Sequence, residues 1–222
     1  MTRLRWIVVV AGLLVVGMSF YPHAERIRGG RYGRVHIVAP NGEARGVTIL
    51  FSDGGGWNDR DQRAAGVLAS QGVLAVGVDS PQYLSRISAE KASCQNLMGD
   101  VASVSGQIER RFNKPAGDKP LVAGFGLGGI IARKITEQAA PNTVLGFVAA
   151  GVTTADSIGV PLCKVDVPAT DAENLGVHET LGPKSANELA AVILKGISVK
   201  GDRSERFERL NSLSGEQRRS AI

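Results

Sequence analysis

Short apolar runs alternate with segments of helical periodicity along most of this chain. The runs that predict buried strands are 46–51, 72–78, 120–124 and 144–150, with a short alternating edge strand at 33–38. The segments that predict helices are 59–70, 89–113 and the stretch from the glycines at 126–129 to about 139. Apolar strands alternating with helices are typical of the α/β class, with a mostly parallel sheet covered by helices on both faces.

The pattern weakens after residue 156, where prolines interrupt a loop-rich stretch. Ser185–Glu188 is a capping-box sequence before the apolar run Leu189–Leu194, which predicts a helix stopped by Gly196. A strand over 191–199 is the competing interpretation. Residues 201–222 are charged and indicate a tail or linker. We therefore expect the C-terminal part of the fold to be truncated or irregular.

The N-terminal segment predicts export. Arg3 and Arg5 precede the uninterrupted apolar run Trp6–Phe20, which is shorter than the roughly 20 residues of a membrane span. We interpret residues 1–24 as a secretory signal, although Gly17–Ser19 is a poor cleavage site and a retained anchor is the alternative. A buried amphipathic helix is disfavoured because no polar residue interrupts the run. Residues 25–200 would then form one exported domain.

The net charge of +5 comes from scattered basic residues, the densest group being Arg26, Arg28, Arg31 and Arg34. A solvated linker is the simpler interpretation of this group, and attraction to an anionic membrane surface is the alternative. Nucleic-acid binding is not expected, since aromatic residues make up only 5% of the chain and no recognition motif is present.

The two cysteines, Cys94 and Cys163, are candidates for a disulfide because exported proteins mature in an oxidising compartment. Their spacing and the three scattered histidines match no metal-ligand pattern. We expect no metal and no cofactor.

The segment Leu121–Gly129 (LVAGFGLGG) carries the most specific chemical signal. A buried strand, a glycine turn and a helix follow one another as they do around Gly-x-Ser-x-Gly, the nucleophile elbow of α/β-hydrolases. Gly126 occupies the position of the serine and has no side chain that could attack a substrate. The glycines also match a dinucleotide fingerprint, but they follow the wrong strand for it and lack the acidic residue about 20 positions later.

Two further turns follow predicted strands, at the edge where open parallel sheets bind ligands. The glycine run Ser52–Trp57 could supply oxyanion-hole amides, which makes Asp53, Gly54 and Gly55 candidate binding residues, with Leu127 at the elbow. Asp53 could equally serve only to form the turn. Asp79 and Ser80 follow the next strand and are candidates for the same crevice, the simpler interpretation being a turn stopped by Pro81.

A hydrolase of this type also needs a base and an acid. His178 is the candidate base, because it alone of the three histidines follows the elbow; His23 and His36 precede it. A solvent-exposed loop histidine is the simpler interpretation. Candidate acids are Asp156, Asp166 and Asp171, among which the sequence does not choose.

Taken together, Ile49–Trp57, Val76–Ser80 and the glycine elbow resemble the bacterial virulence VirJ/AcvB family over roughly residues 33–165. The resemblance implies a periplasmic α/β-hydrolase-type domain associated with type IV secretion. Partners implied are an anionic lipid or aminoacyl-phospholipid, a secretion-system protein or a second hydrolase-type domain. AcvB-like members are linked to hydrolysis of lysyl-phosphatidylglycerol, and catalytic domains of the family carry Gly-x-Ser-x-Gly at the elbow.

This chain departs from the family at the serine position, and it resembles the N-terminal domain of the tandem AcvB-like proteins. We therefore expect a catalytically degenerate domain that binds a lipid headgroup, a secretion substrate or a partner. The alternatives are a serine-type hydrolase of lysyl-phosphatidylglycerol, with Ser52, Ser80 or another residue as nucleophile, and a unit that supports a separate catalytic domain.

Overall fold

The protein is built on a six-stranded sheet with the strand order β1-β3-β2-β4-β5-β6. The computed structural model describes residues 27–114, 118–152, 157–164, 177–181 and 186–198, and for 177–181 the backbone only. The strands are β1 (Val35–Val38), β2 (Gly46–Phe51), β3 (Val73–Val78), β4 (Leu121–Phe125), β5 (Gly146–Ala150) and β6 (Val177–Leu181). Only the pairing of β1 with β3 is antiparallel. The predicted fold class is therefore confirmed.

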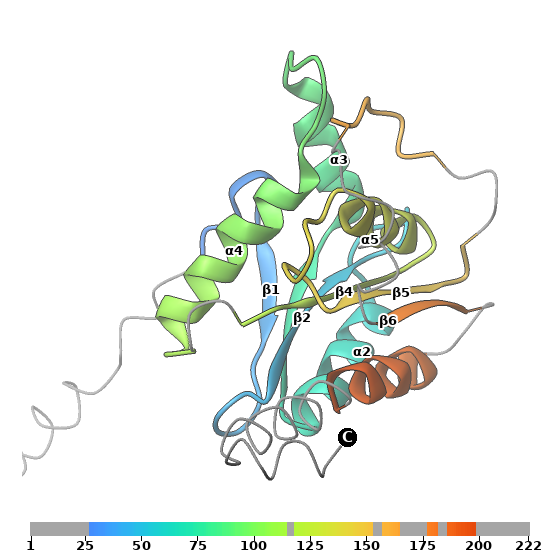
Figure 1. Ribbon diagram of the computed structural model, residues 1–222. Coiled ribbons are helices and arrows are strands. Elements are labelled where there is room, and N and C mark those ends of the chain that lie inside the picture. The colour runs from blue at the N-terminus through green and yellow to red at the C-terminus, as the bar shows by residue number, and fades with distance from the viewer. Residues whose placement is uncertain (1–26, 115–117, 153–156, 165–176, 182–185, 199–222) are drawn as a thin grey trace, which may run out of the picture.

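Helices cover both faces of this sheet (Figure 1). One face packs against α3 (Ser80–Ala89), α4 (Leu97–Arg111) and α5 (Leu127–Glu137), and the other against α2 (Asp59–Ser70) and a helix over residues 186–198. A short 3-10 turn, η1 (Gly30–Tyr32), leads into the edge strand β1. The central strands β2, β3, β4 and β5 are buried along their whole length, as their unbroken apolar runs predict.

The segment between β3 and β4 differs from the prediction. The helix predicted over 89–113 is present as α4, over Leu97–Arg111 only, and α3 (Ser80–Ala89), which was not predicted, lies between β3 and α4. The turn expected at Pro81 is the beginning of α3: Asp79 caps the helix by accepting a hydrogen bond from the Gln82 N–H (2.9 Å). Proline tolerates the first turn of a helix because the N–H it lacks would have no partner there. The prediction treated this proline as a stop.

The C-terminal part also differs in two details. Strand β6 extends the sheet by pairing with β5, where the sequence predicted only loops. The predicted helix is present over 186–198, which excludes the competing strand, but it continues through Gly196. The predicted capping box overlaps residues 182–185, which lie outside the described part of the chain, as do the predicted signal 1–24 and the tail 201–222. No helix in the described ranges is long and apolar enough to cross a membrane.

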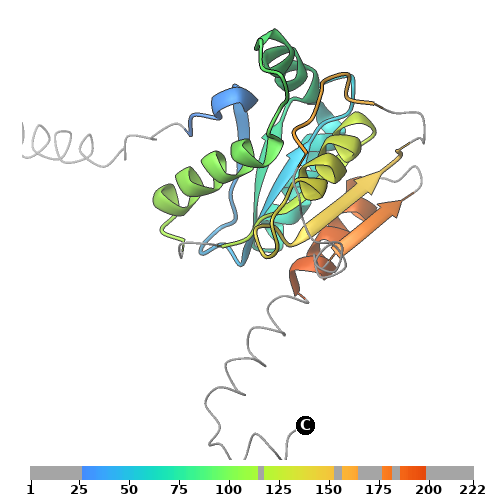
Figure 2. The same ribbon diagram turned by 45° about the horizontal axis from the view of Figure 1, so that its top comes forward.

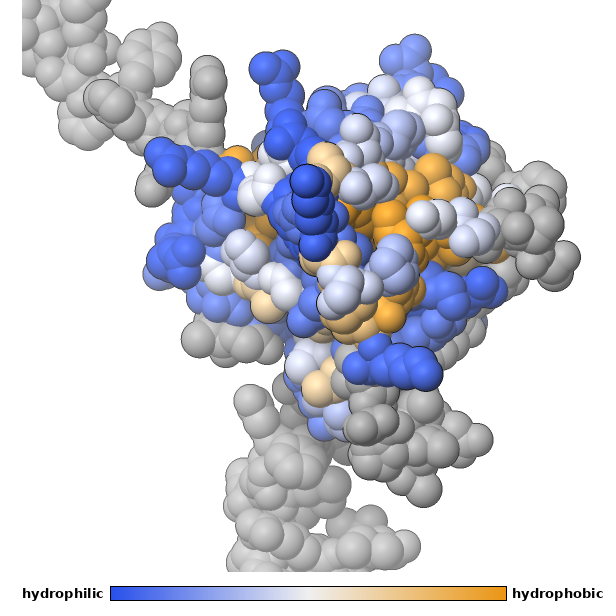
Figure 3. Space-filling view, turned by 90° about the horizontal axis from the view of Figure 1, so that it is seen from above, coloured by the Kyte–Doolittle hydropathy of each residue, from blue (hydrophilic) through white to orange (hydrophobic). Residues whose placement is uncertain are grey.

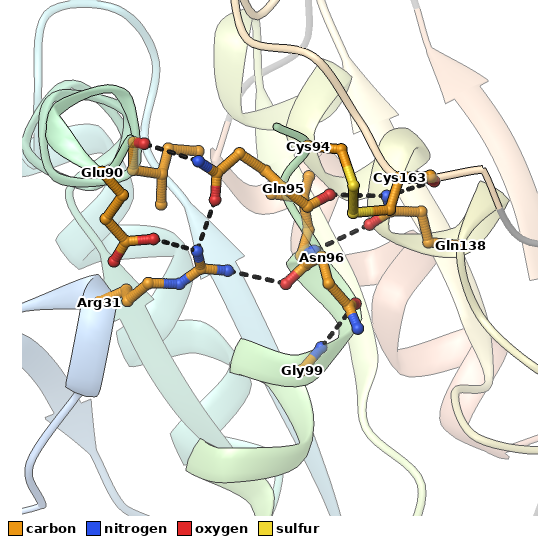
Figure 4. The surroundings of a disulfide bond; sticks show 10 residues. Arg31, Glu90, Cys94, Gln95, Asn96, Gly99, Gln138 and Cys163 are labelled. Atoms are coloured by element: carbon orange, nitrogen blue, oxygen red, sulfur yellow. Dashed lines mark hydrogen bonds and ion pairs between the residues drawn. A yellow bond between two sulfur atoms is a disulfide. The ribbon is translucent and has the colours of Figure 1, made fainter. Parts of the chain in front are cut away.

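A disulfide between Cys94 and Cys163 joins the α3–α4 connection to the segment 157–164 (Figure 4). Backbone hydrogen bonds of Gln95 with Pro161 (2.8 Å) and Cys163 (3.1 Å) lie beside it. The Gln138 side chain donates to both the Gln95 carbonyl (2.9 Å) and the Cys163 carbonyl (3.0 Å). The disulfide and these hydrogen bonds hold the loop-rich segment against the helical layer.

Arg31 is also part of this region and is not a solvated linker residue. Its guanidinium donates to both carboxylate oxygens of Asp100 (2.8 and 2.7 Å), to Glu90 (2.7 Å) and to Gln95 (2.6 Å). The hydrogen bond to Asp100 raises the pKa of Arg31 above its ordinary value. One of the four arginines after the predicted signal is therefore part of the hydrogen-bond network of the fold.

Candidate functional site: an elbow without a nucleophile

The turn between β4 and α5 has the backbone shape of a nucleophile elbow. Gly126 adopts φ 48° and ψ −116°, a conformation that residues with a Cβ rarely tolerate, and it directly precedes α5. Its N–H donates to the Ala150 carbonyl of β5 (2.8 Å) and its carbonyl accepts from the Ile130 N–H (3.2 Å). The strained strand–turn–helix geometry of a hydrolase is therefore present without its side chain.

The neighbouring glycines are explained by close packing. A Cβ at Gly124 would lie 2.6 Å from the Gly128 carbonyl oxygen, and a Cβ at Gly128 would lie 2.6 Å from the carbonyl carbon of Phe51. The start of α5 thus lies directly against β4 and β2, which only glycine allows. The glycine spacing needs no nucleotide to account for it.

The carboxylate of Asp53 fills the place that a nucleophile side chain would take. A Cβ built on Gly126 would overlap Oδ1 of Asp53, and would lie 2.6 Å from its Cγ and 2.8 Å from Oδ2. Oδ1 accepts hydrogen bonds from the backbone N–H groups of Gly54 (2.7 Å) and Leu127 (3.1 Å). Asp53 therefore does more than form its own turn.

Those two N–H groups are the counterparts of an oxyanion hole. In α/β-hydrolases the hole consists of the N–H of the residue after the nucleophile and an N–H from the loop after a central strand. Leu127 follows Gly126, and Gly54 lies in the loop after β2. In this chain one intramolecular carboxylate oxygen accepts from both, so the hole is filled from within the protein.

Arg60, in the first turn of α2, holds the other side of the Asp53 carboxylate. Its guanidinium lies 3.6 Å from Oδ2 of Asp53, 3.8 Å from Oδ1 of the buried Asp61 and 4.1 Å from the centroid of the Phe125 ring. A cation over an aromatic face is favourable, and here the ring belongs to the last residue of β4. Arg60 thus fixes Asp53 beside the elbow.

Asp61 is an unusual acid next to this arginine. Its side chain has no exposed surface, and Oδ2 accepts from the Asn58 N–H (3.0 Å) in the capping box of α2. Burial, which disfavours the charged form, raises the pKa of Asp61 to about 6. Neither Arg60 nor Asp61 was predicted as a site residue. Two features of the sequence could have pointed to them: an arginine in the first turn of a helix, where the helix dipole disfavours a positive charge, and an acid at the third position of the same helix.

Ser52, Asp79 and Ser80 tie the ends of β2 and β3 together. Ser80 donates its N–H to Oγ of Ser52 (3.0 Å) and its hydroxyl to the Ser52 carbonyl (2.5 Å), and neither serine has exposed surface. Asp79 accepts from the Trp57 N–H (3.1 Å) besides capping α3. Both serines are therefore structural, and Ser80 has no surface for a ligand.

The candidate base His178 lies in β6. The strand register aligns Phe125 with Ala150 and Ala150 with Leu181, whereas His178 is aligned with Phe147. The backbone of His178 is thus three strand positions, about 10 Å, before the edge at which the elbow lies. His36 lies in β1, the edge strand at the other end of the sheet from β6, and its ring stacks on that of Trp57 with centroids 4.7 Å apart. Burial lowers the pKa of His36. His23 and the candidate acids Asp156, Asp166 and Asp171 lie outside the described residues.

The structure thus brings four of the predicted site residues together at the elbow: Asp53, Gly54, Gly126 and Leu127. Gly55 is exposed in the same loop, and Asp79 is hydrogen-bonded to the Trp57 N–H at the end of that loop. Within the described ranges no group of three or more histidine, cysteine or acidic residues could hold a metal ion.

Comparison with known proteins agrees with the resemblance predicted from the sequence. Residues 45–143 match the family described as bacterial virulence protein (VirJ). This range contains the Asp53 loop, β3 and the elbow, so the resemblance to the VirJ family is confirmed for the part of the chain that forms the site. None of the curated proteins matches the chain.

Several solved structures are similar to this chain. One is LpqC, a poly(3-hydroxybutyrate) depolymerase from Bordetella parapertussis, at 13% identity over 77% of this chain and 73% of that one, with a TM-score of 0.47. Another is XC6422 from Xanthomonas campestris, an α/β serine hydrolase without a lid, at 13% identity over 74% and 87%, with a TM-score of 0.42. An α/β serine hydrolase homologue from Coxiella burnetii has 16% identity over 72% and 89%, with a TM-score of 0.43.

Proposed function

We propose that this protein is a periplasmic, catalytically degenerate α/β-hydrolase-type domain of the VirJ kind. Its role is to bind a lipid headgroup, a type IV secretion substrate or a partner protein. The observation that carries this proposal is the carboxylate of Asp53 in the position of the nucleophile, hydrogen-bonded to both N–H groups that would stabilise an oxyanion.

A negative charge in this position opposes hydrolysis in two ways. It occupies the hydrogen-bond donors that the transition state needs, and it repels a second developing negative charge. The chain therefore lacks the serine and also blocks the place where the serine would act. A domain of this kind retains the fold and the surface of a hydrolase, which support binding.

The alternative is a serine-type hydrolase of aminoacylated phosphatidylglycerol. The elbow conformation and the paired N–H groups favour it, because a hydrolase site needs this strained backbone and these hydrogen-bond donors. It requires a nucleophile from another position. Ser52 and Ser80 are poor candidates, since both are fully buried and hydrogen-bonded to each other.

Labelling with a fluorophosphonate probe separates the two proposals, because the probe reacts only with an activated serine. The whole chain is incubated with the probe beside an active serine hydrolase as positive control, and any labelled residue is located by mass spectrometry. We expect no labelled serine. A stoichiometrically labelled serine, lost when that residue alone is replaced by alanine, would overturn the degenerate assignment in favour of the hydrolase.

A further inference from the structure

A basic groove lies on the outer surface of α4, on a different part of the molecule from the elbow. Its volume is about 860 Å³, and it runs between α4 and the chain that enters η1. The backbone N–H of Arg28 donates to the Gln107 side chain (2.8 Å), which fixes the entering chain beside the helix. The side of the molecule where α4 lies is mostly hydrophilic in Figure 3, whereas hydrophobic residues gather to the right of its centre.

Three arginines line this groove, and no acidic residue does: Arg28, Arg110 and Arg111. All three are exposed. Among the described residues none of them takes part in an ion pair, unlike Arg31, Arg60, Arg133 and the paired lysines. Arginines without acidic partners leave a concentrated positive potential that a solvated linker would not create.

The floor of the groove is made of small residues of α4, Ala102, Ser103 and Gly106. A Cβ at Gly106 would lie 3.5 Å from Nη1 of Arg110, so the arginine folds back along the helix over the glycine. The Arg110 guanidinium therefore lies over the hollow that Arg28 and Arg111 also line, and that of Arg111 lies 5.6 Å from the centroid of the Phe112 ring. Guanidinium groups are the preferred partners of phosphate oxygens, which they bind with two parallel hydrogen bonds.

We propose that this groove binds the phosphate groups of an anionic phospholipid surface. Position along the chain favours a membrane over a soluble phosphate compound. Ile27 at the groove follows Phe20, the end of the predicted signal or anchor, by seven positions, which is at most about 25 Å of extended chain. In a chain that keeps its anchor the groove lies within reach of the headgroups. After cleavage, charge alone holds it there, at about 1 kcal/mol for each basic residue near the surface.

The test is cosedimentation of the whole chain with vesicles of phosphatidylcholine alone and of phosphatidylcholine with one-third phosphatidylglycerol. Binding through the apolar N-terminal run occurs on both kinds of vesicle, so the binding to phosphatidylcholine alone is subtracted from the binding to the anionic vesicles. The variant Arg110→Gln/Arg111→Gln removes two charges from the groove. The matched control Arg63→Gln/Lys195→Gln removes two exposed charges from α2 and the helix 186–198, on the other face of the sheet. Thermal unfolding verifies that both variants are folded.

We expect the groove variant to bind the anionic vesicles roughly 10- to 30-fold more weakly at low salt, with the control within about 2-fold of the wild-type chain. Salt should weaken wild-type binding and have less effect on the groove variant. An equal loss in both variants would show an effect of net charge and overturn the groove. Release from the vesicles by millimolar glycerol phosphate would overturn the membrane assignment and indicate a soluble phosphate ligand. Neither result depends on the elbow, so the degenerate assignment is tested separately.

Discussion

At the scale of single residues, Asp53 and Gly126 are coupled. Glycine at position 126 avoids both the strain of φ 48° and an overlap with the Asp53 carboxylate. Either residue examined alone in the sequence has a simple explanation, as a turn former or a turn glycine. Their contact shows that the Asp53 carboxylate occupies the space that a side chain at position 126 would take.

A double-mutant cycle measures this coupling. We expect Gly126→Ala to lower the free energy of unfolding by about 2–3 kcal/mol, from backbone strain and the overlap with Asp53. In an Asp53→Ala background the same change should cost about 1 kcal/mol less, because the overlap is gone. Urea denaturation of the four proteins gives the values.

Gly159→Ala is the matched control for backbone strain. Gly159 has φ 68° and open space where a Cβ would be, so its replacement should cost the strain alone and be insensitive to Asp53→Ala. Additive effects of Gly126→Ala and Asp53→Ala would show that the carboxylate does not occupy the elbow.

Asp61 makes stability depend on pH in a direction opposite to that of most surface acids. Its pKa of about 6 in the folded protein exceeds the 3.8 of an unperturbed carboxyl. Between these values the folded state binds the proton that the unfolded state releases, so the free energy of unfolding falls as pH rises from about 4 to 6. Asp61→Asn keeps an oxygen for the Asn58 N–H and removes the titration.

We therefore expect the stability of Asp61→Asn, relative to wild type, to rise by about 1–2 kcal/mol between pH 4 and pH 7. Denaturation at pH 4, 5.5 and 7 measures the difference. Asp59→Asn, an exposed acid in the same helical turn, serves as control and should show no such rise. A relative stability of Asp61→Asn that is flat or falling with pH would contradict a raised pKa.

At the scale of elements, the sequence predicted the strands and helices that are specified by their own hydrophobic pattern or capping residues. Strands β2, β3, β4 and β5 are buried throughout because helices cover both of their sides, and they were predicted almost to their ends. The start of α2 at residue 59 was also predicted, and Asn58 caps the helix there. Helix α3 was not predicted, since a proline in the first turn of a helix, as Pro81 is, and a proline that ends an element look alike in sequence.

Elements that depend on distant partners were the ones missed. Strand β6 is defined by its pairing with β5, and the local sequence of β6 does not indicate this pairing. Of the site, the elbow and the glycine loop could be recognised from their spacing, whereas the roles of Arg60 and Asp61 come from contacts between α2 and two different strand ends. Local sequence does not specify such contacts.

The segment 157–164 is an element held by a covalent bond. Figure 1 shows it at the edge of the molecule, running outward from the connection between α3 and α4, and Figure 2 shows the same region from a second direction. The disulfide Cys94–Cys163 closes a loop of 69 positions, which removes conformational freedom from the unfolded chain.

We expect Cys94→Ser/Cys163→Ser to lower the free energy of unfolding by about 2–4 kcal/mol, measured by urea denaturation. The wild-type chain in reductant should match the double variant, while the variant itself should not respond to reductant. Identical unfolding of the wild-type chain with and without reductant would show that the bond does not stabilise the fold.

At the scale of the whole molecule, two separate surfaces follow from the fold. The carboxyl ends of β2 and β4 form the filled elbow, and the outer side of α4 forms the basic groove. The match to the VirJ family covers the strands and helices that build the elbow. We therefore propose that this chain has the framework of an α/β-hydrolase without its chemistry.

Turnover of lysyl-phosphatidylglycerol by the wild-type chain tests this account most directly. Lysine release from vesicles containing the lipid is followed by chromatography, with a serine hydrolase active on ester lipids as positive control. We predict no release above the rate without protein, for the wild-type chain and for Asp53→Ala alike. Lysine release that persists through purification and is changed by Asp53→Ala would contradict the account, because it would place an active site where we find a filled one.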